Sequence, residues 1–342
     1  MPEMNTETMS GKPTRRWTTG GPLSILPGNM GRRSTDTPWG EAAKPANSLR
    51  VLLQHLVDYA GLFPPAGLDM KTAVANYARY REGVSGWMLG RFVVPATRLG
   101  ELSDALERLS GKHPLWKASV IAGEKLLGDL AAIRQFNQRH DGRVLIDAME
   151  MKASTPDEVR RAREYVDESI ALFVEIPANN PGEMFDAIKL GNAHAKLRTG
   201  GTSQEMVPSV EDVARFLVAS SKAKVAFKAT AGLHHPVRCV KPFTYEKDSA
   251  SGLMHGFLNV FVAATIARVG ASEQEVAQVL SADLPEQFSF ADDGATVRAL
   301  AGEQEYHVST ELFSETRRSF AVSFGSCSFE EPIEDLRSIQ LL

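Results

Sequence analysis

The sequence predicts a (β/α)8 barrel, because short apolar runs alternate with longer amphipathic ones eight times between residues 47 and 302. Strands that alternate with helices at this spacing indicate βαβ units and a parallel sheet. A barrel of this class takes about 250 residues, which the segment supplies. The competing fold is an open doubly wound sheet, but no G-x-G-x-x-G motif follows the first predicted strand.

Composition narrows the possible partners and the compartment. The 342 residues are 43% hydrophobic and 23% charged, with a net charge of −4, which gives no reason to expect nucleic acid or an anionic membrane as a partner. The two cysteines, Cys239 and Cys327, form no CxxC pair, which excludes a disulfide scaffold and a four-thiolate zinc site. No apolar stretch is long enough to cross a bilayer, so we expect a cytoplasmic protein.

The elements follow in order along the chain. Residues 1–46 are rich in Gly, Pro, Ser, Thr and Arg without apolar periodicity, and we expect them to form a disordered tail. Helix-start signals such as Ser154-Thr155-Pro156 come after several of the apolar runs. Residues 303–342 exceed the minimal barrel and are expected to be a C-terminal extension packed on it, with 324–332 as a lid or an oligomer contact. The eight predicted strands are 58–63, 87–95, 115–123, 143–151, 170–177, 193–201, 224–232 and 287–294.

Alternation along each strand predicts which side chains face the lumen. One face of a barrel strand meets the helices and must be apolar, and the other builds the active site near its carboxyl end. In the run AHAKLRT, for example, Ala195 and Leu197 form the apolar set, so the opposite face carries the polar residues. In RVLIDAM, Ala148 is assigned to the apolar face. The inward residues predicted in this way are Arg91, Asp147, Glu175, His194, Lys196, Arg198, Lys228 and Thr230.

This inward set concentrates ionisable groups on four neighbouring strands. Burying one such charge unpaired is costly, so the charges either pair as a structural network that fills the barrel or take part in chemistry. Their predicted position at strand carboxyl ends favours chemistry. A lysine that loses its proton can attack a carbonyl and form a Schiff base, with a carboxylate to move protons. Lys196, Lys228, Asp147 and Glu175 are the candidate catalytic residues.

The stretch AKLRTGG, followed by a helical segment and then VAFKATAGLHH, resembles the strand-six to strand-seven region of class I aldolases of the deoxyribose-phosphate aldolase type. In that family one lysine forms the Schiff base and a second lowers its pKa, and the resemblance implies these roles for Lys196 and Lys228. It covers residues 194–235. Arg198 stands where the family has a small residue, and Leu233-His234-His235 replaces part of its phosphate-binding turn. A carboxylate or another oxygenated carbonyl compound, held by Arg198 or Arg91, is therefore at least as probable as a phosphorylated substrate.

The leading hypothesis is an aldolase or related carbon–carbon lyase that needs no cofactor and acts on a small oxygenated carbonyl compound. His234 and His235, after the seventh predicted strand, would bind substrate or act as acid–base groups, with His194 and Thr230 as further contacts. One alternative is a metal-dependent lyase or isomerase with Asp147 and Glu175 as ligands. Another is a non-catalytic barrel that binds a ligand. We expect a small-molecule partner, and association into a homo-oligomer is compatible with the fold.

Overall fold

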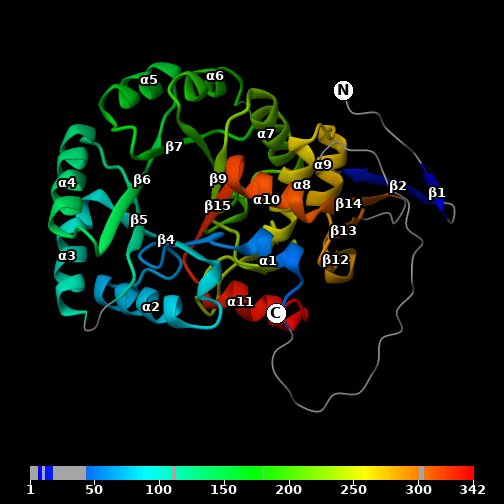
Figure 1. Ribbon diagram of the computed structural model, residues 1–342, viewed down its shortest axis with the longest axis horizontal. Coiled ribbons are helices and arrows are strands. Elements are labelled where there is room, and N and C mark those ends of the chain that lie inside the picture. The colour runs from blue at the N-terminus through cyan, green and yellow to red at the C-terminus, as the bar shows by residue number, and fades with distance from the viewer. Residues whose placement is uncertain (1–6, 10–11, 18–43, 110–112, 180, 300–303) are drawn as a thin grey trace, which may run out of the picture.

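The computed structural model describes residues 7–9, 12–17, 44–109, 113–179, 181–299 and 304–342 (Figure 1). Eight parallel strands close into a barrel, which confirms the predicted fold class. In spatial order the barrel strands are β15 (Ala321–Ser326), β3 (Val57–Tyr59), β4 (Leu89–Pro95), β5 (Trp116–Ile121), β6 (Val144–Lys152), β7 (Ala171–Ile176), β8 (His194–Arg198) and β9 (Phe227–Thr230).

Helices surround the barrel, and side-chain caps mark the start of several of them. Thr155 and Ser209, for example, accept hydrogen bonds from backbone N–H groups in the first turns of α5 and α7, as N-cap residues do. The helices are α1 (Asn47–Leu53), α2 (Met70–Glu82), α3 (Leu99–Arg108), α4 (Leu126–Arg139), α5 (Pro156–Tyr165), α6 (Gly182–Leu190), α7 (Val210–Ala223), α8 (Phe257–Arg268), α9 (Glu273–Leu280), α10 (Thr310–Ser319) and α11 (Glu330–Ser338).

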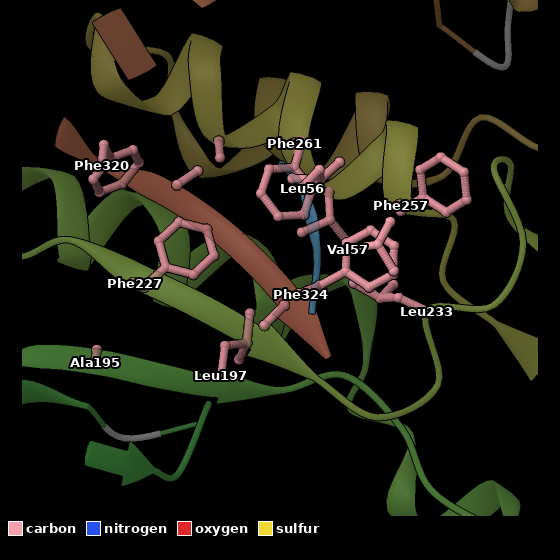
Figure 2. Packing of buried hydrophobic residues seen from close by; sticks show 14 of the residues in the cluster. Leu56, Val57, Ala195, Leu197, Phe227, Leu233, Phe257, Phe261, Phe320 and Phe324 are labelled. Carbon is pink, nitrogen blue, oxygen red and sulfur yellow. The ribbon is translucent and has the colours of Figure 1, made fainter. Parts of the chain in front are cut away.

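One cluster of aromatic rings lies where α8 covers the junction of β9 and β15. Figure 2 shows Phe227 and Phe324 reaching from these two strands toward α8. The Phe324 ring stacks on Phe257 at 5.3 Å between centroids and lies 6.0 Å from Phe261. Helix α8 is apolar almost all round because it is buried on every side. The barrel therefore closes under a layer of interlocked rings.

The eighth barrel strand is not the predicted segment 287–294. Phe288–Phe290 forms β12, which pairs antiparallel with β13 (Gly294–Arg298) outside the barrel, and β15 occupies the eighth position between β9 and β3. The phenylalanines at alternate positions of β12 give it the same two-residue apolar period as a barrel strand. In β15 the lumen-facing positions hold a serine, Ser323, and a glycine, Gly325, so its apolar pattern is weak. Residues 303–342 are therefore not an extension, because they contain the strand that completes the barrel.

A smaller sheet stands beside the barrel, next to α9 in Figure 1, with the strand order β1-β2-β14-β13-β12. It includes β14 (Glu305–Ser309), β1 (Glu7–Met9) and β2 (Lys12–Trp17). Strand β2 pairs parallel with β14, so these parts of the segment 1–46 are strands, not the disordered chain that composition predicts. Backbone pairing to an available sheet edge needs no apolar periodicity in the added strand. The rest of the predicted tail, apart from residues 44–46, lies outside the described residues.

Two smaller features complete the fold. A hairpin of β10 (Cys239–Pro242) and β11 (Ser251–Met254) leaves the barrel after β9. Within the described part of the chain, no helix combines the length and the apolar character that crossing a membrane requires.

The role of β15 in closing the barrel makes a prediction about stability. Phe324→Ala is expected to lower the free energy of unfolding by about 3–5 kcal/mol, because it leaves a cavity between two buried rings. Urea denaturation at pH 7 measures this change. The control is Leu190→Ala, at a side chain that is 82% exposed, where a change within about 0.5 kcal/mol is expected. A loss below about 1 kcal/mol for Phe324→Ala would contradict the central packing of β15.

Candidate active site

A cavity of about 760 Å³ opens at the carboxyl ends of the barrel strands, where barrel enzymes hold their active sites. Its walls come from the loops after β3, β5, β8 and β9, and its floor from charged side chains of β6 to β9. Apolar wall residues include Phe63, Pro65, Val93, Ile121 and Leu126. The charged and polar lining residues are Glu124, Glu150, Lys152, Glu175, Lys196, Arg198, Thr202, Lys228, Thr230 and His234.

Lys228 on β9 is clamped between two carboxylates. Its Nζ donates hydrogen bonds of 2.7 Å to Asp58 Oδ2 and to Glu150 Oε1, and the side chain is 1% exposed. Burial alone would lower the pKa of Lys228, but the negative charges of Asp58 and Glu150 outweigh burial and raise it. Ser323 on β15 donates a further hydrogen bond to Asp58. Lys228 is therefore a fixed cation.

Lys196 on β8 lies beside Lys228, because the two residues are register partners in the parallel pair β8–β9. Its Nζ is 2.9 Å from Glu150 Oε2 and 3.1 Å from Glu175 Oε2. Glu150 thus bridges both lysines, one with each oxygen. Ser119 also donates a hydrogen bond of 2.7 Å to Glu150. Burial would raise the pKa of the Glu150 carboxyl, but Lys228 and Lys196 hold it far below its usual range.

Glu175 joins the floor to the open part of the cavity. Its Oε1 accepts a hydrogen bond of 2.9 Å from Arg198 Nε, while Oε2 is buried and lies 3.1 Å from Lys196 Nζ. Burial would raise the pKa of Glu175, but Lys196 and then Arg198 lower it. Arg198 is about one-third exposed, and the neighbouring Lys152 is exposed and forms no ion pair within the described residues. These two side chains add positive charge to the cavity rim.

The floor is electrically balanced. Three cations, Lys196, Lys228 and Arg198, meet three carboxylates, Asp58, Glu150 and Glu175. Partners of opposite charge offset the free-energy cost of removing each group from water. A reaction at any of these six groups must therefore leave their net charge unchanged or alter it by a single proton.

The structure brings together six of the ten residues that the sequence predicts for the site. Lys196, Lys228, Glu175, Arg198, Thr230 and His234 line the same cavity. His235 does not line it, and its Nδ1 lies 2.5 Å from Asp335 Oδ2 on α11.

The other three residues lie nearer the amino ends of the strands and do not line the cavity. Arg91 forms a two-point ion pair with Asp147 at 2.6 and 3.0 Å, and Lys117 is 3.1 Å from the same carboxylate. His194 packs against the Phe173 ring at 5.1 Å, and burial lowers its pKa. In barrels this end usually contributes stability, not catalysis.

Sequence reasoning missed Glu150 because β6 contains a bulge. Ala118 pairs with Ile146 but Ser119 pairs with Ala148, so β6 holds one extra residue at Asp147. A one-residue shift reverses the faces of all later side chains. Ala148 therefore shares the lumen with Glu150, and Met149 packs in the core beneath the helices. The assignment of Ala148 to the outer face is wrong.

Asp58 was also missed, although its signal is present in the sequence. It stands between Val57 and Tyr59, which both belong to the outer core. The predicted first strand began at Asp58 and ended at Phe63, so the alternation of Val57, Asp58 and Tyr59 fell across its boundary. The observed strand, Val57–Tyr59, displays that alternation directly.

Within the described ranges, no group of three or more His, Cys, Asp or Glu side chains is arranged to hold a metal ion. Comparison with protein-family models, curated proteins and solved structures finds no match to this chain. Function is therefore argued from the geometry of the cavity.

The bridging role of Glu150 predicts a large and pH-dependent loss of stability in Glu150→Gln. At pH 7 the loss should be about 3–5 kcal/mol, because two buried lysines lose a shared counter-charge. The folded-state pKa of Glu150 is depressed, so its contribution is present above its unfolded pKa of about 4.3 and is lost as pH falls. The difference from the native chain should therefore narrow below about pH 4.

Urea denaturation at pH 7, 4 and 3 measures this effect. Glu107→Gln is the matched control, because Glu107 is half exposed and pairs with Arg139 at the surface. That control should cost at most about 1 kcal/mol. An equal loss in the two variants would show that the floor does not depend on Glu150.

Proposed function

We propose that this protein is a barrel enzyme that forms a Schiff base through Lys196, as an aldolase or related carbon–carbon lyase does. The observation that supports this most is the pair of lysines in register on β8 and β9, at the floor of one cavity and linked by Glu150. The resemblance to deoxyribose-phosphate aldolases in residues 194–235 points to the same two lysines.

Lys196 is the better nucleophile of the two. Lys228 makes two hydrogen bonds of 2.7 Å to carboxylates and is completely buried, so losing its proton would leave Asp58 and Glu150 without their shared cation. Lys196 has longer contacts, of 2.9 and 3.1 Å. One of its partners, Glu175, also borders the open cavity. Lys228 then serves as the fixed charge that holds Glu150 in place.

The proton balance of imine formation suits this floor. Lys196 gives a proton to Glu175 Oε2, and the free amine attacks the substrate carbonyl to form a carbinolamine. Glu175 returns the proton to the carbinolamine hydroxyl, which leaves as water, and a protonated iminium remains. An ammonium has been replaced by an iminium of the same charge. The balance of three cations and three carboxylates is therefore kept, and the iminium accepts electrons when an adjacent carbon–carbon bond breaks.

The lining suggests the class of substrate. Apolar side chains such as Val93, Ile121 and Leu126 suit a small carbon skeleton, while Arg198 and Lys152 place positive charge at the rim. A guanidinium recognises a carboxylate well, because its donors match the two oxygens. A small carbonyl compound that carries a carboxylate fits both features.

Reductive trapping tests the nucleophile. The protein is incubated with a panel of small aldehydes, ketones and keto acids, borohydride is added, and the intact mass and a peptide map are recorded. A stable adduct on Lys196 is expected, and Lys196→Arg should abolish it because a guanidinium does not form an imine. Lys117→Arg, on the neighbouring part of the barrel lumen, is the matched control and should retain the adduct. An adduct confined to Lys228, or none across the panel, would refute the proposal.

The role of Arg198 makes a separate prediction about selectivity. Arg198→Gln should reduce the rate of trapping by pyruvate about 10- to 100-fold, the value of a charge-assisted hydrogen bond, and leave trapping by acetone nearly unchanged. Rates are followed by mass spectrometry at low probe concentration. Arg268→Gln is the control, because Arg268 pairs with Glu315 away from the cavity. Equal slowing for both probes would show that Arg198 does not bind the carboxylate.

A further inference from the structure

A second polar network stands on the cavity wall, apart from the lysine floor. Its centre is Glu331 on α11, whose Oε2 lies 2.9 Å from His234 Nδ1 and accepts a hydrogen bond of 3.0 Å from the Tyr245 hydroxyl. His234 follows β9 and lines the cavity. Cys327 also lines the cavity, and its Sγ lies 3.7 Å from the Tyr245 hydroxyl. The imine chemistry described above uses none of these side chains.

The backbone before His234 is shaped to turn the chain back over the cavity. Ala231 and Gly232 both have positive φ angles, of 60° and 76°, which is uncommon for alanine. A Cβ at Gly232 would lie 2.7 Å from the Gly200 Cα, so the loops after β8 and β9 touch backbone to backbone. The Thr199 hydroxyl fixes this contact by donating to Ala231 O at 2.6 Å. The loop that carries His234 is thereby held against the loop that follows Lys196 and its strand.

The pairing with Glu331 sets the protonation pattern of the imidazole. Burial would raise the pKa of Glu331, but its hydrogen bond with His234 and the nearby histidine charges lower it. An ionised carboxylate accepts a hydrogen bond from the Nδ1–H group of His234. In the neutral ring, Nε2 is then the nitrogen without a proton, and it can accept one. A carboxylate that orients a histidine in this way is a recurrent arrangement in acid–base catalysis.

We propose that His234 is the acid–base residue that moves the proton on the carbon next to the imine carbon, with Glu331 as its positioning residue. This inference rests on the proposed Schiff base at Lys196. His234 Nε2 takes a proton from the α-carbon, the C–H electron pair becomes the C=C bond of an enamine, and the C=N electron pair moves to the nitrogen. The iminium charge is neutralised as the imidazole becomes imidazolium. The reverse transfer returns the proton.

This assignment divides proton transfer between two walls of the cavity. Glu175 contacts Lys196 and transfers the protons of the Lys196 nitrogen and of the departing water. His234 transfers the proton of the α-carbon. An imidazole that accepts a proton on one nitrogen while the other keeps its hydrogen bond suits a proton that must be taken and returned in each cycle. Glu150 and Asp58 are occupied by Lys228 and take no part in this step.

The chain offers a matched control. His235 is the next residue and has a similar partner, because its Nδ1 lies 2.5 Å from Asp335, one turn after Glu331 on α11. Both histidines tie the loop after β9 to α11, but His235 does not line the cavity. His235→Gln therefore removes the same kind of structural contact without removing the proposed acid–base group.

The experiment follows exchange of the acetone and pyruvate methyl protons in D2O by NMR, with borohydride trapping measured in parallel. His234→Gln should slow exchange at least about 100-fold and leave the adduct on Lys196. Glu331→Gln should slow exchange about 10-fold, and His235→Gln less than about threefold. Thermal unfolding of each variant identifies any loss of folding, in which case Glu331→Gln carries the test.

The other outcomes distinguish the role of the His234 imidazole from the role of the loop contact and from the Schiff base itself. Exchange at the native rate in folded His234→Gln, with the adduct retained, would overturn the role of His234 and leave the Schiff base intact. Equal slowing in His234→Gln and His235→Gln would show that the loop contact, not the imidazole, is responsible. If the native chain gives neither adduct nor exchange, the proposed function fails and this inference fails with it.

Discussion

The burial of two lysines side by side in the barrel lumen is the constraint on which the rest of the site depends. Each ammonium needs carboxylates within hydrogen-bond distance, and these come from different strands: Asp58 from β3, Glu150 from β6 and Glu175 from β7. The barrel must therefore close in one register for the charges to meet. A shift of any of these strands would leave a charge in a low-dielectric interior without its partner, at a cost of several kcal/mol.

The bulge in β6 shows how the register is adjusted to meet this constraint. If β6 were a regular strand with no bulge at Asp147, the alternation that puts Ile146 against the helices would also direct Glu150 to the helices. With the bulge, one strand presents Asp147 to the ion pair with Arg91 and Glu150 to the lysine floor. A local irregularity thus lets one strand supply a carboxylate to each of two separate charge clusters, which an unbroken alternation would not do at these positions.

The two ends of the barrel are built differently around this floor. Toward the amino ends, Arg91, Lys117 and Asp147 form a compact ion-pair group that fills the lumen. Toward the carboxyl ends, the side chains leave a cavity. His234 on its wall is held by Glu331 of α11, which also accepts a hydrogen bond from Tyr245 in the loop between β10 and β11. The ion-pair group and the cavity are thus separated along the barrel axis, as stabilising and catalytic groups usually are in this fold.

One arginine side chain also stabilises the closure of the barrel near α1. Arg317 on α10 donates to the Leu52 and Gln54 carbonyls at the end of α1 and to carbonyls at the start of β15. Its burial lowers its pKa to about 9. A single side chain therefore links the first helix to the last barrel strand, where the ends of the barrel sequence meet.

The sequence by itself determined the alternation of strands and helices, and with it the barrel and most of the charged floor. Lys196, Lys228, Glu175 and Arg198 could be predicted because each lies in a strand whose apolar residues keep a strict two-residue period. That period reflects a local property, the opposite faces of a strand. The same rule failed at Glu150, because a bulge is decided by how β5 and β6 pair and leaves no mark in the apolar pattern.

Only the tertiary structure decided which segment closes the barrel and what surrounds His234. Strand β15 has small lumen residues, and it is a barrel strand because β9 and β3 both pair with it. Glu331 is 97 residues from His234 along the chain, and no local spacing relates the two. Contacts of this kind depend on closure of the whole barrel, since α11 reaches the loop after β9 only when the eighth strand is in place.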